Sequence, residues 1–72
     1  MPTLQHTKPE SLIRLPEVMR RTGRGRTAIY ADMAAGTFPR SVSIGPRAVA
    51  WPESSIDAWI AERVTQATGN AA

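Results

Sequence analysis

The chain has 72 residues, a formal net charge of +3, no cysteine and one histidine, His6. This length suffices for one small domain, and the lack of thiols together with a lone histidine excludes disulfide scaffolds and most zinc-binding or histidine-based catalytic sites. Because no apolar segment approaches the roughly 20 residues of a membrane helix and no signal-peptide core follows Met1, we expect a soluble cytoplasmic protein that does not contact a membrane.

Positive charge is concentrated in one part of the sequence. Residues 14–47 hold seven arginines and two acids, whereas residues 53–62 hold three acids and no basic residue. Arginine pairs bidentately with phosphates and guanine edges. The pattern therefore predicts a domain with one basic face. The alternative, a charged surface that only maintains solubility, would predict mixed signs along the chain.

One folded domain is predicted over residues 12–64. Residues 1–11 contain two prolines and polar residues without periodicity, which predicts a flexible amino-terminal arm. Residues 65–72 are small and polar, and they predict a flexible carboxy-terminal tail.

The first predicted helix begins at Pro16, because proline fits the first helical position, where its missing N–H would have no partner. Glu17 in the first turn suits the positive end of the helix dipole, and Gly23 supplies a left-handed stop. A helix of about two turns is unstable alone. It is expected to pack through its apolar face, which comprises Leu15, Val18, Met19 and Thr22.

A second helix is predicted over residues 26–35. It starts after Gly25 and stops at Gly36, with Ala28, Ile29 and Met33 facing inward. The short glycine turn joins it to the first helix as in a helix-turn-helix. In that motif the second helix enters the major groove of DNA while the first braces it.

A β-hairpin is predicted over residues 41–51, turning at Gly45-Pro46. Its buried face, expected to sit on the helices because two strands alone are marginal, would comprise Val42, Ile44, Val49 and Trp51. Pro52 then begins a third helix, whose inward stripe would comprise Ile56, Trp59, Ile60 and Val64. The expected fold is a small, mainly α (α+β) winged helix-turn-helix of three short helices with a two-stranded wing.

Candidate DNA contacts gather at the start of the second helix. Arg24, Arg26 and Thr27 occupy the part of a recognition helix that reaches base edges. Arginine can read guanine there, and threonine can contact a phosphate or a thymine methyl. Tyr30 lies one turn further on the same outward face, where it either contacts a phosphate or covers the edge of the core. The alternative for Arg26 and Thr27 is an ordinary solvent-facing first turn.

Four further arginines are candidate contacts. Arg47 lies at the tip of the hairpin and Arg40 at its base, from where a wing enters the minor groove or grips a phosphate; the alternative for both is a solubilising role. Arg20 and Arg21 end the first helix, where they either bind phosphates or only favour the helix dipole.

No catalytic or metal site is expected. The acids of residues 53–62 have no histidine, nucleophile or base to act with. Trp51 and Trp59 could stack on single-stranded bases, but their spacing places both in the apolar stripes and favours core packing. We therefore expect no enzymatic activity, no cofactor and no bound metal.

A set of short segments, spread over roughly residues 13–64 without gaps, carries a resemblance to a known family. These segments are Leu15-Pro16-Glu17-Val18, Thr22-Gly23, Arg26-Thr27, Ile29-Tyr30, Gly36, Phe38-Pro39-Arg40, Ile44-Gly45, Arg47, Trp51 and Ile56-Asp57-Ala58-Trp59-Ile60. The chain resembles the AlpA-type phage and prophage regulators. The resemblance implies a MerR-like winged helix, related to phage excisionases, that binds DNA. The DNA face that it implies comprises Arg26, Thr27, Tyr30 and Arg47.

The chain departs from the family pattern at three positions. Gly25 stands in place of a capping serine, which costs roughly a few tenths of a kcal/mol. Arg24 replaces an apolar residue and Ala31 replaces a basic one. Alanine cannot bind a phosphate through its side chain, and Arg24 could make that interaction in its place.

Together these features predict a sequence-specific, double-stranded DNA-binding transcriptional regulator, with helix 26–35 in the major groove and wing 41–51 on the backbone or in the minor groove. An excisionase-like recombination directionality factor that bends DNA stays open, as does a phage packaging or adaptor module that docks proteins. Candidate protein partners are a recombinase or RNA polymerase. Without a heptad or long dimerisation helix, a monomer in solution is expected, and cooperative binding to repeated sites stays open.

Overall fold

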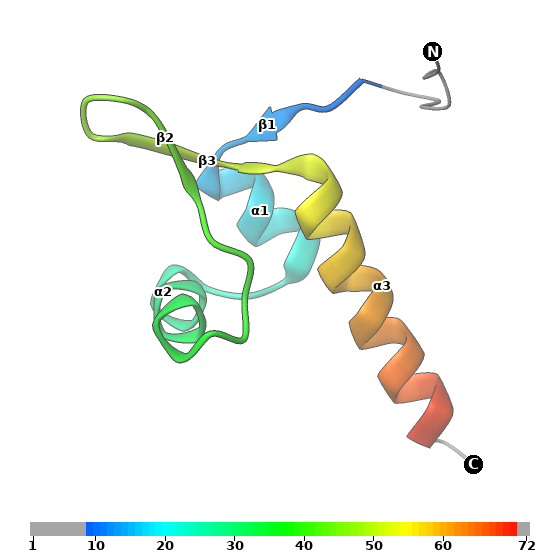
Figure 1. Ribbon diagram of the computed structural model, residues 1–72. Helices are drawn as coiled ribbons and strands as arrows, with labels where there is room; N and C mark the ends of the chain where they lie inside the picture. The colour runs from blue at the N-terminus through cyan, green and yellow to red at the C-terminus, as the bar shows by residue number, and fades with distance from the viewer. Residues whose placement is uncertain (1–8, 71–72) are drawn as a thin grey trace.

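The computed structural model describes residues 9–70 of the chain. Six elements follow one another in this range: β1 (Leu12–Ile13), α1 (Leu15–Thr22), α2 (Arg26–Ala35), β2 (Val42–Gly45), β3 (Ala48–Pro52) and α3 (Glu53–Asn70) (Figure 1). The strands form an antiparallel sheet in the order β1-β3-β2. α1 and α3 both contact β3, and α2 contacts α1. The prediction of a small α+β fold with three helices and a hairpin wing is confirmed.

The first two helices end where glycine allows the backbone to turn. Gly23 (φ 74°) and Gly36 (φ 82°) both adopt the left-handed conformation, and their N–H groups bond to carbonyls of the preceding helix. Residues with a Cβ are disfavoured there. α1 begins one residue earlier than predicted, at Leu15, with Arg14 in an extended conformation before it. α2 has the predicted bounds.

The core consists of a few apolar side chains drawn from every helix, from β3 and from the link between α2 and β2. The buried residues are Val18, Ile29, Phe38, Ala50, Trp51 and Ile56. Trp51 is fully buried, and its indole Nε1 donates a 2.9 Å hydrogen bond to the Pro39 carbonyl. Because an unpaired buried N–H is costly, this bond fixes the link against the sheet. Trp51 therefore packs in the core, as expected.

The predicted buried face of the hairpin is wrong for β2. Val42 and Ile44 are 40% and 43% exposed. The observed register pairs Val42 with Ala50 and Ser43 with Val49, and it shifts at Ile44, which is an extra residue in β2. A change of one residue in register moves a strand's side chains to the opposite face. Val42 consequently lies on the same face as its partner Ala50, opposite Val49.

β1 is a strand that the sequence analysis did not predict. Ile13 pairs with Trp51, and the Glu53 N–H donates a 2.7 Å hydrogen bond to the Ser11 carbonyl. The Glu10 carboxylate accepts hydrogen bonds from the Ser54 amide (3.2 Å) and hydroxyl (2.6 Å), at the start of α3. The predicted arm over 1–11 falls mostly outside the described residues; its last part, residues 9–11, lies against α3.

α3 is longer than expected and continues through residues predicted to be a tail. It runs to Asn70 over 18 residues, because no proline follows Pro52 and the alanines beyond residue 60 favour a helix. Val64, expected in the inward stripe, is 58% exposed, since the helix extends past the core at this point (Figure 1). No helix within residues 9–70 is both long and apolar enough to cross a membrane.

Candidate nucleic-acid interface

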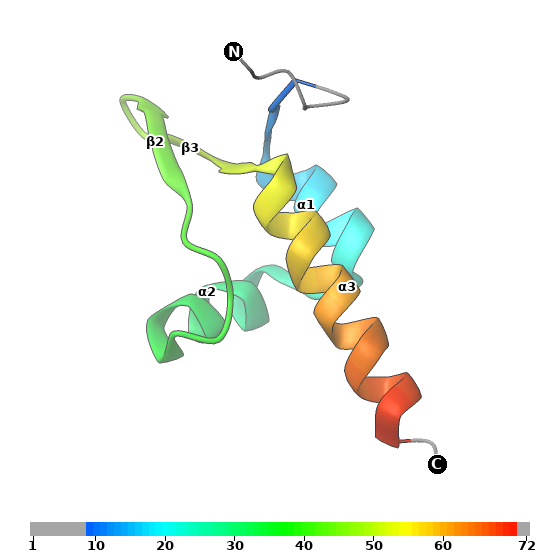
Figure 2. The same ribbon diagram turned by 45° about the vertical axis from the view of Figure 1, so that its right-hand side comes forward.

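The recognition-helix candidate and the wing lie on the same side of the molecule. Two views that differ by 45° both place α2 and the tip of the β2–β3 hairpin on one side, with the end of α3 on the other (Figures 1 and 2). A helix and a hairpin tip in this arrangement can contact one duplex at the same time.

A hollow of about 530 Å³ lies between α1, α2 and the wing. Three arginines from three separate parts of the chain line it: Arg14 before α1, Arg26 at the start of α2 and Arg47 at the hairpin tip. Tyr30 contributes a fourth polar side chain, and the remaining lining is apolar, from Leu15, Pro16, Met19 and Val49. No carboxylate within residues 9–70 forms an ion pair with any of these three arginines.

Arg47 is held in an unusual backbone conformation. Its φ is +57°, and it is the one non-glycine residue among residues 9–70 with a positive φ. This conformation costs roughly 1–2 kcal/mol for a residue with a Cβ. It follows Pro46 in a two-residue turn, where proline presets the first corner and a left-handed residue forms the second. Strained residues of this kind concentrate at functional sites, which supports Arg47 as a candidate contact.

Arg26 opens α2, and its position is electrostatically unfavourable for the free helix. A cation at a helix amino terminus opposes the helix dipole, and the first turn of α2 has no acidic residue, whereas α1 has Glu17 and α3 has Glu53. Gly25 supplies no side-chain cap. The Arg26 guanidinium lies 5.8 Å from the centre of the Tyr30 ring. The start of α2 is consequently open to an anion.

A second, smaller hollow of about 300 Å³ also has Tyr30 in its lining. Arg40 and Ser41 line it together with Tyr30, Met33 and Ala34. Tyr30, which is 40% exposed, belongs to both hollows. Tyr30 therefore lies beside Arg40 in the smaller hollow and beside Arg26 and Arg47 in the larger one. Thr27 is exposed in the first turn of α2.

Three of the predicted DNA-contacting arginines form ion pairs with carboxylates of the chain. Arg21 is half-buried, hydrogen-bonds to Asp57 and lies 3.6 Å from Glu53, so that it joins α1 to α3. Arg24 pairs with Asp32. This arrangement favours the structural alternative for Arg21.

Arg20 remains exposed while its Nε donates a 2.9 Å hydrogen bond to Glu17. This bond lowers the pKa of Glu17 and raises the pKa of Arg20. Because the pair is at the surface, it is screened by salt and easily exchanged for another anion. Arg20 thus differs from Arg21, whose partners lie on another helix.

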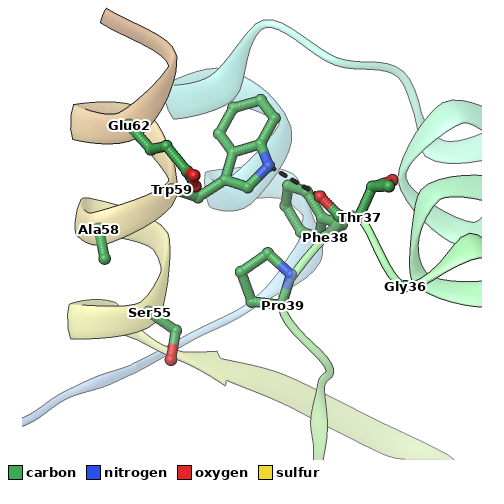
Figure 3. A pocket seen from close by; sticks show the side chains of 8 residues that line it. All are labelled: Gly36, Thr37, Phe38, Pro39, Ser55, Ala58, Trp59 and Glu62. Carbon is green, nitrogen blue, oxygen red and sulfur yellow. Dashed lines mark hydrogen bonds between the residues drawn. The ribbon is translucent and has the colours of Figure 1, made fainter. Parts of the chain in front are cut away.

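A third hollow, of about 390 Å³, lies between α3 and the link from α2 to β2 (Figure 3). It shares no lining residue with the arginine-lined hollow. Trp59 packs edge-to-face on Phe38, with ring centres 5.1 Å apart, and its Nε1 donates a 3.2 Å hydrogen bond to the Thr37 carbonyl (Figure 3). Both contacts are those of a packing residue, as predicted for Trp59. Glu62 is the charged residue of this hollow.

Arg14 was not among the DNA-contacting residues predicted from the sequence. It precedes a predicted helix whose apolar face and proline explained the surrounding residues, and only the packing of α1 beside α2 and the wing brings it to Arg26 and Arg47. The one signal in the sequence was its inclusion in the arginine-rich segment 14–47. Within the described part of the chain, no group of three histidine, cysteine or acidic side chains is arranged to hold a metal ion.

The family described as "Prophage CP4-57 regulatory protein (AlpA)" matches residues 11–64, which include every element from β1 to the middle of α3. The chain belongs to the AlpA family. The resemblance found in the sequence is thereby confirmed, and the arginine-lined hollow lies entirely within the matched residues.

Two relatives accompany this family match. ORF88 of Enterobacteria phage P4, an uncharacterised protein, is 44% identical over 55 residues, which cover 76% of this chain and 62% of ORF88. The chain thus spans less than two thirds of that relative. The DNA-binding transcriptional activator AlpA of Escherichia coli K12 is 34% identical over 58 residues, covering 72% of this chain and 83% of that protein. No solved structure shows significant similarity to this chain.

Proposed function

We propose that this AlpA-family chain is a sequence-specific regulator of transcription that binds double-stranded DNA. In the proposed complex α2 lies in the major groove, and the wing of residues 41–51 lies on the backbone or in the minor groove. Arg26 and Thr27 read bases, while Arg20, Arg24, Arg40 and Tyr30 contact the backbone. Arg21 is left out because its ion pairs hold α1 against α3.

The observation that carries this proposal is the convergence of Arg26 and Arg47 beside Tyr30, without an acidic partner among the described residues. Guanidinium groups kept apart from carboxylates remain available to phosphates and base edges. The open amino terminus of α2 adds favourable electrostatics for an anion. The name of the Escherichia coli relative, a DNA-binding transcriptional activator, supports the same function.

Selection from randomised duplexes, followed by binding measurements on the selected and on random DNA, tests this function. If Arg26 reads a guanine bidentately, Arg26→Ala should lose about 1–3 kcal/mol on the selected site and relax specificity at one base pair. Arg63→Ala is a matched control, because Arg63 is also exposed but stacks on Trp59, 4.9 Å from its ring centre. Equal losses on selected and random DNA would make Arg26 a phosphate contact. Failure to select any sequence would refute specific recognition.

An excision factor that bends attachment-site DNA is the second candidate, since the family description refers to a prophage. Such a factor would work with a recombinase, whereas a transcription activator or repressor would work with or against RNA polymerase. Circular-permutation bending assays and footprints on promoter and attachment DNA separate the two. Strong bending confined to attachment DNA would favour the excision factor.

A packaging or adaptor module is the third alternative. In that case the protein would show no affinity for DNA in gel shifts at low salt, and the Trp59 hollow with Glu62 would be the place to seek a protein partner. We propose a monomer in solution acting at the nucleoid, with cooperative binding where sites are repeated. Sedimentation with and without DNA measures both states.

A further inference from the structure

We infer that the hollow lined by Arg14, Arg26 and Arg47 holds one phosphodiester of a bound duplex between Arg14 and Arg47, with the adjoining deoxyribose on its apolar floor, while Arg26 reaches the neighbouring base. Arg14 is the new residue in this assignment. The clamp would fix the distance between the recognition helix and the wing, and thus the register of the protein on DNA. The inference rests on the proposed DNA-binding function and adds a specific contact to it.

Three cations converge on this hollow although nothing within residues 9–70 neutralises them there. Like charges that line one concave surface repel one another, and the hollow focuses their field. An anion that enters between them removes this repulsion and accepts hydrogen bonds from planar guanidinium groups, whose geometry suits phosphate oxygens. The free protein is therefore arranged for a negatively charged group at this point.

The backbone at each arginine is fixed by the structure. Arg14 lies between β1, which pairs with β3, and α1, whose Val18 N–H donates a 3.0 Å hydrogen bond to the Arg14 carbonyl. Arg26 opens α2, and Arg47 occupies the left-handed corner of the wing turn. Because the three backbones are preset, less freedom is lost when their side chains close on a ligand.

The remaining lining indicates what accompanies the phosphate. Leu15, Pro16, Met19 and Val49 offer apolar surface and no hydrogen-bonding side chains. A volume of about 530 Å³ exceeds what a phosphate group alone would fill, and a sugar ring has the apolar edge to cover such a floor. The polar side chains are donors apart from the Tyr30 hydroxyl, so that the amino groups of adenine and cytosine would find few acceptors. The hollow therefore suits the sugar–phosphate backbone better than a base.

Salt dependence of DNA affinity provides the test. Arg14→Gln, which keeps most of the side-chain length, should weaken binding to selected and random duplexes by the same factor, on the order of tenfold. The slope of log K against log salt should become shallower by at most about 0.9, the value for one phosphate contact on B-DNA, since Arg47 still faces the same phosphate. Arg14→Lys should fall between Arg14→Gln and the parent protein. Arg63→Ala should leave the slope unchanged, since that side chain stacks on Trp59.

Neutral methylphosphonate linkages, placed one at a time along the selected duplex, locate the contact. One position should weaken binding of the parent protein by a larger factor than binding of Arg14→Gln, because part of the same interaction is then already missing. Additive losses at every position would overturn the clamp. So would an unchanged salt slope in Arg14→Gln, and neither result would touch the proposed DNA binding. If the parent protein binds no DNA at all, the function itself fails.

A free phosphate is the other source of the same chemistry. Titration of the parent protein with inorganic phosphate, followed by NMR of its arginine side chains, should give weak binding that duplex DNA abolishes by competition. Tight phosphate binding that persists in the DNA complex would assign the hollow to a soluble anion and overturn the inference. Thermal unfolding of Arg14→Gln should match the parent, because Arg14 is exposed and makes no side-chain cap to α1.

Discussion

Replacing Arg47 by glycine should separate the two effects of this residue, its backbone strain and its charge. The left-handed conformation at φ +57° costs about 1–2 kcal/mol for a residue with a Cβ, and glycine relieves this cost. Glycine also gains freedom in the unfolded chain, which offsets about 0.4–1 kcal/mol. The net stabilisation is therefore about 0.8 kcal/mol, or roughly 3–6 °C in Tm for a domain of this size.

The same substitution removes a guanidinium from the proposed interface. Arg47→Gly should consequently bind DNA more weakly than the parent, with a shallower salt slope, although it is more stable. Thermal unfolding by circular dichroism and anisotropy titrations at several salt concentrations measure the two effects on the same samples. The rise in Tm reports the relieved backbone strain, and the shallower salt slope reports the lost charge.

Arg47→Ala is the matched control, because it removes the charge and keeps the strained backbone. It should lose the same affinity and slope as Arg47→Gly with little change in Tm. A lower Tm for the glycine variant would refute the strain argument. An unchanged salt slope in both variants would remove the wing tip from the interface.

Three further predictions concern the supporting structure. Arg21→Ala should lower the free energy of unfolding by about 1–2 kcal/mol, since the partly buried ion pair of Arg21 with Asp57 lies between surface and buried ion pairs. Urea unfolding measures this loss of stability, and reduced DNA affinity at full stability would contradict the prediction. Gly25→Ser should raise stability by about 0.3 kcal/mol through a side-chain cap, because no atom lies within 4 Å of an added Cβ; a lower Tm would contradict this. Hydrogen bonds from Ser54 lower the pKa of Glu10, so their contribution to folding is complete above the ordinary glutamate range and is lost as pH falls through the lowered pKa. NMR titration should show the pKa of Glu10 rising in Ser54→Ala, and an unchanged value would exclude the contact in solution.

The bounds of the first two helices were predictable because they depend on local backbone chemistry. Gly23 and Gly36 permit left-handed corners, and Pro16 suits a first turn whatever the rest of the chain does. The periodicity of the apolar residues likewise identified Val18 and Ile29 as core residues. These rules need only a few neighbouring residues.

The wing and the arginines required information from distant parts of the chain. The register of β2 depends on the left-handed corner at Arg47 and the extra residue at Ile44, neither of which alternation in the sequence reveals. β1 has two residues, too few for any periodicity. The partner of Arg21, Asp57, is 36 residues away, and Arg14 reaches the wing only through tertiary packing.

The ion pairs neutralise some arginines and leave the remaining positive charge concentrated on one part of the surface. Acids on α1, α2 and α3 pair with Arg20, Arg24 and Arg21 respectively. Among residues 9–70, five arginines have no acidic partner. Arg63 stacks on Trp59, and the other four line the two hollows that share Tyr30: Arg14, Arg26, Arg40 and Arg47. The molecule extends 35–40 Å along two axes, whereas the Debye length at physiological ionic strength is about 8 Å. Charges that lie much further than this from the two hollows are therefore largely screened, and the arginines that line the hollows dominate the local field. The positive face should attract a duplex more strongly than a net charge of +3 suggests.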